Sequence, residues 1–150
     1  PLALGLESGA TPDSKLQASS ARQAGQAAKF ARLHLQASKD NDACWCPDSA
    51  DTEKSLDIML SERSLVTGVA IQGRGNGQEW VAELTIAIND TIEGQEYIIQ
   101  ENKTTKVFNG NFDSNSVVKL TFASAMYATS IKLKPRSWHG HPCLRAEVYG

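Results

Sequence analysis

A two-residue hydrophobic period runs through most of the chain from Ser55 onward. In the stretch WVAELTIAI, one face of an extended strand would carry Trp80, Ala82, Leu84, Ile86 and Ile88. Similar alternation occurs in SLDIML, LVTGVAIQG, VVKLTF, SIKLK and CLRAEVYG. Because the side chains of a strand alternate between its two faces, this pattern predicts half-buried strands. Short strands separated by Gly, Asn, Asp and Ser turns are typical of an all-β sandwich or barrel.

The same alternation predicts which side chains of the later strands face inward. We expect the inward set to consist of Val118, Leu120, Phe122, Ile131, Leu133, Leu144, Ala146 and Val148. In the last strand Arg145 and Glu147 fall on the opposite face from these apolar residues. The inward faces of these strands therefore predict a single hydrophobic core, to which most of the chain contributes.

Size and charge restrict the function class. The 150 residues make one domain of ordinary size, and no linker or internal repeat divides them. The chain has 15 Lys and Arg residues against 17 Asp and Glu residues, which gives no general attraction to nucleic acid or an anionic membrane. No apolar run approaches the roughly 20 residues that a membrane span requires. Since the chain starts at Pro1 without a charged and apolar leader, we expect a processed product or an excised domain.

One segment disagrees with the strand pattern. The stretch ARQAGQAAKFARLHLQA, Ala21 to Ala37, is rich in Ala, Gln, Arg and Leu, and these residues favour helix. Gly25 interrupts the stretch, and no N-cap residue stands at the right spacing. Local propensity therefore predicts a helical turn or two within an otherwise β-rich chain.

No catalytic motif is present. The sequence has no Gly-x-Ser-x-Gly elbow, no phosphate-binding Gly-Lys-Ser/Thr loop and no His-Glu-x-x-His. The run GRGNG, Gly73 to Gly77, leads from one predicted strand to another instead of into a helix, so it is interpreted as a loop. Four carboxylates, Asp40, Asp42, Asp48 and Asp51, follow a polar stretch that is typical of a solvated loop. We expect no enzyme activity, no catalytic residue and no cofactor.

Three cysteines leave several chemical alternatives open. Cys44 and Cys46 flank a tryptophan, and Cys143 lies in WHGHPC near the end of the chain. A zinc site would need these thiolates with His139 and His141, but the spacing is not one that zinc sites usually show. A redox pair usually has two residues between its cysteines. The remaining alternative is a disulfide from one of the pair to Cys143, which would close a loop of about 100 residues and contribute ~4 kcal/mol.

Several motifs together resemble the discoidin domain family, which includes the C domains of coagulation factors V and VIII. The motifs are PLALGLESGATPDSKLQASS at the start, then ARL, CW, LDIML, VTGVAIQGRG, EWV and VFNGN, and SIKLKPRSWHGHPCLRAEVYG at the end. The resemblance runs from Pro1 to Gly150, so residues 1–150 are interpreted as one discoidin domain. It implies a jelly-roll β-sandwich of about eight strands, similar to galactose-binding domains, with ligand loops at one end. It also implies that Ala21 to Ala37 is a projecting loop with a short turn instead of a long helix.

The resemblance also implies a pairing for the cysteines. Discoidin domain receptors carry a similar WCP and a similar CLR, joined by a disulfide, which here correspond to Cys46 and Cys143. Trp45 then becomes a core or core-edge residue, and Cys44 remains as a free thiol or an intermolecular link that would join chains into an oligomer. No metal is expected.

The family implies a non-catalytic extracellular binding module. Its members bind sugars, anionic phospholipid surfaces, collagen or other proteins through loops at one end of the sandwich. The matching loops here are Ala21 to Lys29, Gln36 to Ala43 and Gly73 to Glu79, with His139 to His141 beside them. The first three contain no Trp, Phe, Ile or Met, and their charges are mixed, so membrane insertion is disfavoured.

The remaining ligand classes are glycans and proteins. QGRGNGQEWV and WHGH resemble the slime-mould discoidin lectins, which bind galactose-type sugars, and this predicts a lectin acting in cell adhesion. The alternative is a protein ligand such as collagen, because Arg74 and Glu79 match an Arg and a Glu that help discoidin domain receptors bind collagen. The candidate ligand-binding residues are Lys39, Asp40, Asn41, Asp42, Arg74, Asn76, Glu79, His139 and His141. Two Asn-x-Thr sequons predict glycosylation at Asn89 and Asn102 if the protein is secreted.

Overall fold

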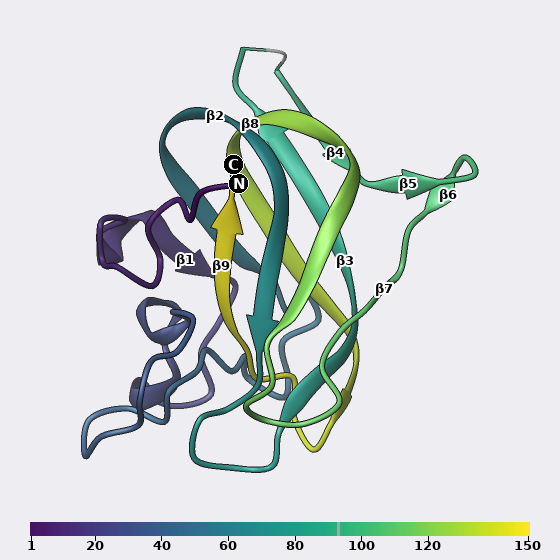
Figure 1. The fold of residues 1–150 in the computed structure, drawn as a ribbon. Coiled ribbons are helices and arrows are strands. Elements are labelled where there is room, and N and C mark those ends of the chain that lie inside the picture. Colours follow the sequence, from purple (N-terminus) through teal and green to yellow (C-terminus); the bar gives the residue numbers. More distant parts are fainter. Residues whose placement is uncertain (93) are drawn as a thin grey trace.

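The fold is an antiparallel β-sandwich with short connections at both ends (Figure 1). A computed structural model describes residues 1–92 and 94–150. The strands in this part of the chain are β1 (Leu16–Ala18), β2 (Leu56–Gln72), β3 (Trp80–Asp90), β4 (Gln95–Ile98), β5 (Gln100–Glu101), β6 (Thr104–Thr105), β7 (Phe108–Asn109), β8 (Val118–His139) and β9 (Arg145–Tyr149). Three single-turn 3-10 helices precede most of the strands: η1 (Asp13–Lys15), η2 (Ala24–Gln26) and η3 (Ala28–Phe30). Within the described chain, no helix is long and apolar enough to cross a membrane.

Two long strands, β2 and β8, connect the layers of the sandwich. The first half of β2 pairs with the second half of β8, as Ile58 opposite Ile131 shows. The second half of β2 pairs with the first half of β8, as Val69 opposite Leu120 shows. The main path of the sheet runs β1-β2-β8-β3-β4, while β9 pairs with β2 and β7 pairs with β3. The four separate stretches predicted from SLDIML, LVTGVAIQG, VVKLTF and SIKLK thus join in pairs into two long strands.

The core lies between these layers and follows most of the predicted inward set. Leu120, Phe122, Ile131 and Leu133 are buried, together with Leu144, Ala146 and Val148 from the end of the chain. Trp45 is fully buried in the same cluster, and its Nε1 donates to Ser20 O at 2.8 Å. The predicted core role of Trp45 is therefore confirmed.

The predicted register of β3 is wrong at its beginning. Register shifts on both sides of Glu83 break the alternation, so Val81 is fully buried while Trp80 and Ala82 are half-buried. From Leu84 to Ile88 the predicted inward face is buried. A β-bulge adds one residue to a strand and moves every side chain before it to the other face, which period-two counting does not detect.

The segment Ala21 to Ala37 forms no long helix. It contains only the 3-10 turns η2 and η3, and its backbone is otherwise irregular. Local helix propensity is weak in comparison with tertiary contacts. Here such contacts hold the segment against the loop that carries Cys46. Arg22 N donates to Cys46 O at 2.8 Å, and Cys46 N donates to Gln26 O at 3.0 Å. The loop-and-turn expectation is confirmed.

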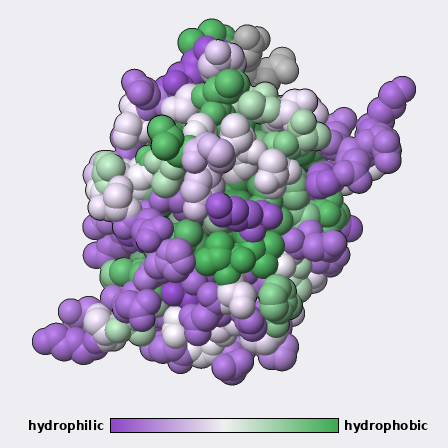
Figure 2. Space-filling view, in the orientation of Figure 1, coloured by the Kyte–Doolittle hydropathy of each residue, from purple (hydrophilic) through white to green (hydrophobic). Residues whose placement is uncertain are grey.

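The two sequons occupy different environments. Asn102 lies in the turn between β5 and β6, is exposed and has a φ of 53°. This hairpin projects from the body of the molecule in Figure 1 and is hydrophilic in Figure 2. Asn89 is half-buried in β3, between Glu96 of β4 and Ser130 of β8.

We expect Asn102 to be glycosylated more completely than Asn89 when the chain passes through a secretory pathway. An exposed turn gives the modifying enzyme access to the sequon backbone, whereas both neighbouring strands pair with Asn89. Intact-mass measurement of the secreted wild type and the Asn102→Gln and Asn89→Gln variants checks this. Loss of most glycan mass in Asn89→Gln, with none lost in Asn102→Gln, would contradict it.

Candidate functional site

Four loops meet at one end of the sandwich, at the bottom of Figure 1. Three of them are the predicted loops, and the fourth is the segment 110–117 between β7 and β8. Backbone hydrogen bonds connect neighbours: Asp42 N donates to Gly25 O at 3.0 Å, Gly75 N to Ala43 O at 3.1 Å, and Gly73 N to Ser114 O at 2.9 Å. The loops therefore form one connected surface.

The loop Gly73 to Glu79 needs glycine where it touches its neighbours. A Cβ at Gly75 would lie 2.4 Å from Ala43 Cβ, and a Cβ at Gly73 would lie 2.7 Å from Glu79 O. Neither approach leaves room for a side chain. Gly75 thus allows close packing against the neighbouring loop, and Gly73 allows close packing within its own loop.

Arg145 holds two of these loops and Leu35, the residue just before a third, from below. It is the first residue of β9 and is only 1% exposed. Its Nε donates to Gly73 O, its Nη1 to Leu35 O and its Nη2 to Ser114 O and Asn115 Oδ1, at 2.8–3.1 Å. Burial lowers the pKa of this guanidinium from its usual value, and its hydrogen-bond partners are all neutral oxygens. Sequence reasoning assigned Arg145 to the opposite face of the last strand and did not anticipate its burial.

A disulfide joins the loops to the start of β9. Cys46 is bonded to Cys143, as the resemblance predicted. Cys44 is a free thiol, fully buried, with its Sγ 2.9 Å from Cys46 Sγ. Burial raises the pKa of the Cys44 thiol to about 12. Within this chain Cys44 is a free thiol, and its burial disfavours the predicted intermolecular link.

Six polar side chains converge above this base, and we call them the loop-end polar cluster. The cluster consists of Arg22, Gln26, Asp42, Arg74, Asn76 and Glu79. Arg74 is at its centre: Nη1 donates to Glu79 Oε1 at 2.8 Å, Nε donates to Asn76 Oδ1 at 2.8 Å, and Nη2 lies 3.4 Å from Asp42 Oδ2. Arg22 Nη2 donates to the same Glu79 oxygen at 2.8 Å. Gln26 and Asn76 each donate to Asp42, at 2.8 and 3.1 Å.

The carboxylates of the cluster are ionised, and Arg74 has N–H donors that no described residue uses. The hydrogen bond from Arg22, followed by that from Arg74, lowers the pKa of Glu79 to about 2. The hydrogen bond from Asn76 is the largest cause that lowers the pKa of Asp42. A guanidinium has five N–H donors, and Arg74 uses three of them on described residues. Arg74 and Asp42 side chains are each 24% exposed, so both present hydrogen-bonding atoms to solvent.

The other predicted ligand residues lie beside the cluster or beneath it. Lys39 and Asp40 are exposed in a tight turn closed by Ser38 and Asn41, while Asn41 uses its side chain to hold that turn. His139 is exposed and stacks on Trp80, with ring centroids 4.2 Å apart and planes 12° apart. A Cβ at Gly140 would lie 3.1 Å from Gln78 O, so this turn adjoins the Gly73 to Glu79 loop.

His141 faces inward. It is 7% exposed, and its Nε2–H donates to Pro47 O at 2.5 Å. Burial lowers the pKa of this imidazole. The structure therefore does not bring His141 to the ligand-facing surface, because its ring holds the loop after Cys46 in place.

Sequence reasoning missed one exposed aromatic and two cluster members. Phe112, in the fourth loop, is 70% exposed. Its loop is held by Gly110 N to Ala82 O at 2.7 Å and Asn111 N to Val81 O at 2.8 Å, beside the start of β3. A single phenylalanine inside the polar run NGNFDSNS was the available signal. Arg22 and Gln26 gave no such signal, because their roles depend on contacts with distant loops.

Comparison with known proteins gives a consistent result. The sequence pattern of the F5/8 type C domain matches residues 15–148. Lactadherin of Rattus norvegicus is 32% identical over 153 residues, which are 98% of this chain and 35% of that protein. The chain thus spans about a third of this relative's length.

Two solved structures share the fold. Discoidin II of Dictyostelium discoideum matches with a TM-score of 0.80 and 23% identity, over 89% of this chain and 54% of that chain. The family 32 CBM from C. perfringens NanJ, solved in complex with galactose, matches with a TM-score of 0.67 and 22% identity, over 93% and 97%. These matches confirm the predicted jelly-roll architecture.

We expect Arg145→Lys to destabilise the domain by about 2–4 kcal/mol, because lysine leaves several buried carbonyl groups without a donor. Chemical denaturation followed by fluorescence measures the loss. Arg136→Lys is the matched control, since Arg136 is exposed and should change stability by less than about 0.5 kcal/mol. Equal stabilities of the two variants would contradict the role of Arg145.

We expect acid to weaken the domain partly through Glu79. Its folded pKa of about 2 is below its ordinary value of 4.5, so its contribution is complete above pH 4.5 and is lost as the pH falls toward 2. Glu79→Gln should remove roughly 1–2 kcal/mol at pH 7 and flatten the decline between pH 5 and 2.

Unfolding titrations at several pH values test this, with the exposed Glu62→Gln as control. An unchanged pH profile in Glu79→Gln would show that the Arg22 and Arg74 contacts do not stabilise the carboxylate.

Proposed function

The chain belongs to the F5/8 type C (discoidin) domain family, and we propose from this that it is a carbohydrate-binding module of a cell-adhesion protein. The family consists of binding modules, not catalysts. The proposal rests on the loop-end polar cluster, in which two loops place Asp42, Arg74 and Asn76 within hydrogen-bonding distance of one another. The sugar hydroxyls would bind there.

The chemistry of the cluster fits a sugar. A hydroxyl group both donates and accepts a hydrogen bond, so its binding site needs a carboxylate beside a guanidinium or amide. Asp42 stays ionised and accepts, while Arg74 keeps two N–H donors beyond its described contacts. Phe112 supplies an exposed aromatic face at the same end, which suits the apolar C–H side of a sugar ring.

The structural neighbours support the same class of ligand. The C. perfringens module was solved with galactose bound, and it shares this fold over most of both chains. We therefore propose a galactose-type glycan as the ligand. Lys39, Asp40 and His139 would contact sugar units beyond the first, since they are exposed around the cluster.

A protein ligand such as collagen is the second candidate. The observation in its favour is the 2.8 Å ion pair between Arg74 and Glu79, which bridges the loop in the positions matching the receptors' collagen-binding Arg and Glu. The described part of Ala21 to Lys29 presents no tryptophan that would anchor such an interface. The glycan proposal ranks first for this reason.

The cysteines support one cellular compartment. A disulfide between Cys46 and Cys143 persists in an oxidising environment, which supports an extracellular location.

We expect Asp42→Asn to reduce affinity for galactose-type glycans by about tenfold or more, because the amide cannot accept at both of its polar atoms. A glycan array with the oligomerised domain identifies the ligand, and calorimetry measures the change. Asp48→Asn, an exposed carboxylate outside the cluster, is the matched control and should bind like the wild type. A blank array in the oligomerised format, with binding to collagen instead, would overturn the proposal.

A further inference from the structure

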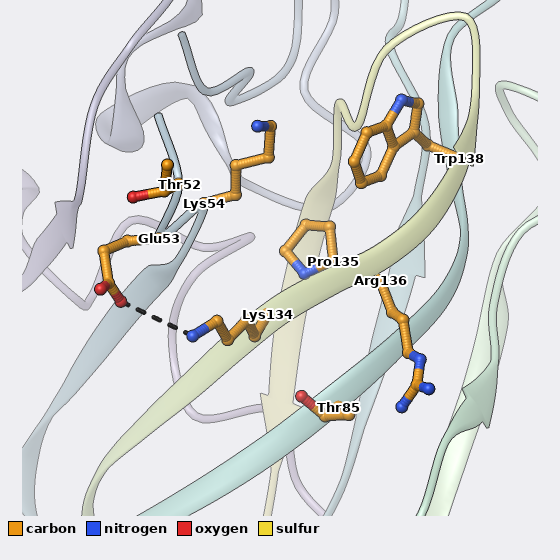
Figure 3. A pocket seen from close by; sticks show the side chains of 8 residues that line it. All are labelled: Thr52, Glu53, Lys54, Thr85, Lys134, Pro135, Arg136 and Trp138. Atoms are coloured by element: carbon orange, nitrogen blue, oxygen red, sulfur yellow. Dashed lines mark ion pairs between the residues drawn. The ribbon is translucent and has the colours of Figure 1, made fainter. Parts of the chain in front are cut away.

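A second concave surface lies on the flank of the sandwich, where the second half of β8 passes the loop before β2. Its lining residues are Thr52, Glu53, Lys54, Thr85, Lys134, Pro135, Arg136 and Trp138. The groove has a volume of about 370 Å³, within the usual range of small-ligand sites. None of these residues belongs to the loop-end polar cluster. Figure 3 shows Lys54 and Trp138 on its two sides, with Pro135 between them.

The strand β8 places two cations and a tryptophan on this flank. Ile131, Leu133 and Pro135 are buried, whereas Lys134, Arg136 and Trp138 are exposed. A register shift between β3 and β8 falls at Arg136 and interrupts the regular alternation there. Figure 3 shows the side chains of Lys134 and Arg136 pointing in different directions from the strand.

The groove is positively charged on a chain of net charge −2. Three of its four ionisable lining residues are cations, so its local charge is +2 (three minus one). Arg136 forms no hydrogen bond or ion pair with any residue that the structure describes. Lys134 lies 3.6 Å from Glu53, but their side chains are 47% and 71% exposed, and such a pair contributes little. Both cations are therefore available to an anion.

Trp138 adds an aromatic surface to the charge. It is 40% exposed, and Lys54 Nζ lies 5.6 Å from its ring centroid. Lys54 is held in that position because its Nζ also donates to Asp51 O at 2.5 Å and Ser49 O at 3.3 Å. The indole of Trp138 and the fixed cation of Lys54 thus line the same groove. The indole suits the C–H face of a sugar ring, and the cation suits an anionic group.

We propose that this groove is a second glycan site, which binds an acidic sugar unit carrying sulfate. The ring packs on Trp138, the anionic groups contact Lys134 and Arg136, and Thr52, Thr85 and Glu53 contact hydroxyls. The separate cations Lys54, Lys134 and Arg136 suit a linear acidic polysaccharide, whose charges recur along its chain. A lipid headgroup fits less well, because the groove lies on the flank of the sheet and has only one large exposed apolar side chain.

The test measures binding of a sulfated heparin-derived tetrasaccharide and of its desulfated, N-acetylated counterpart by calorimetry at two salt concentrations. The groove variant is Lys134→Gln/Arg136→Gln. The matched control is Lys103→Gln/Lys119→Gln, which removes two exposed cations elsewhere. We expect the groove variant to lose about tenfold or more in affinity, the control to change little, and the desulfated probe to bind weakly.

A second readout uses Trp138 directly. The wild type should show reduced acrylamide quenching of fluorescence when the sulfated probe binds, and Trp138→Phe should lose this change. Equal losses in the groove and control variants, or equal binding of both probes, would overturn the proposal. Binding only to vesicles with 20% phosphatidylserine, abolished in the groove variant, would also overturn it in favour of a headgroup site. Asp42→Asn should leave tetrasaccharide binding unchanged, which separates this site from the loop end.

Discussion

The buried guanidinium of Arg145 is the interaction on which the loop end depends. It contacts segments around Leu35, Gly73 and Ser114, which are distant in sequence, and all of its partners are neutral. A buried cation without a carboxylate is costly unless its donors are satisfied, so the carbonyl groups must stay where they are. The loops are therefore positioned by a side chain of β9, which the sandwich core holds in place.

In the loop-end polar cluster, the arginine differs from Arg145 in both its partners and its exposure to solvent. Arg74 pairs with carboxylates, stays near the surface and keeps donors free, whereas Arg145 pairs with neutral oxygens and is sealed. The first arrangement suits ligand binding and the second suits support. The disulfide between Cys46 and Cys143 adds a covalent connection across 97 residues to the same base.

The alternation of apolar and polar residues predicted most of the strands. Predictions from local sequence were wrong where register shifts or contacts with distant segments determine the structure. Alternation identified Leu84, Ile86, Ile131 and Leu133 correctly, because a strand with one inward face must repeat every second residue. It misplaced Trp80 because a register shift between Val81 and Glu83 adds a residue to β3, which no composition rule reveals. The helical composition of Ala21 to Ala37 was overridden by contacts with the Cys46 loop.

The candidate site was only partly predictable. The chemistry of Asp42, Arg74, Asn76 and Glu79 is visible in the sequence, and the structure brings these four together. Their partners Arg22 and Gln26 depend on how the loops pack, and His141 looks like an exposed ligand although it is buried. Exposure of Phe112 follows from the fourth loop, whose position is set by hydrogen bonds to β3.

The most direct measurement is a crystal structure of the domain soaked with a galactose disaccharide at saturating concentration. We expect sugar density in hydrogen-bonding contact with Asp42 and Arg74, with Phe112 against the ring. Sugar bound at another surface, with the cluster unchanged and in contact only with solvent, would contradict it.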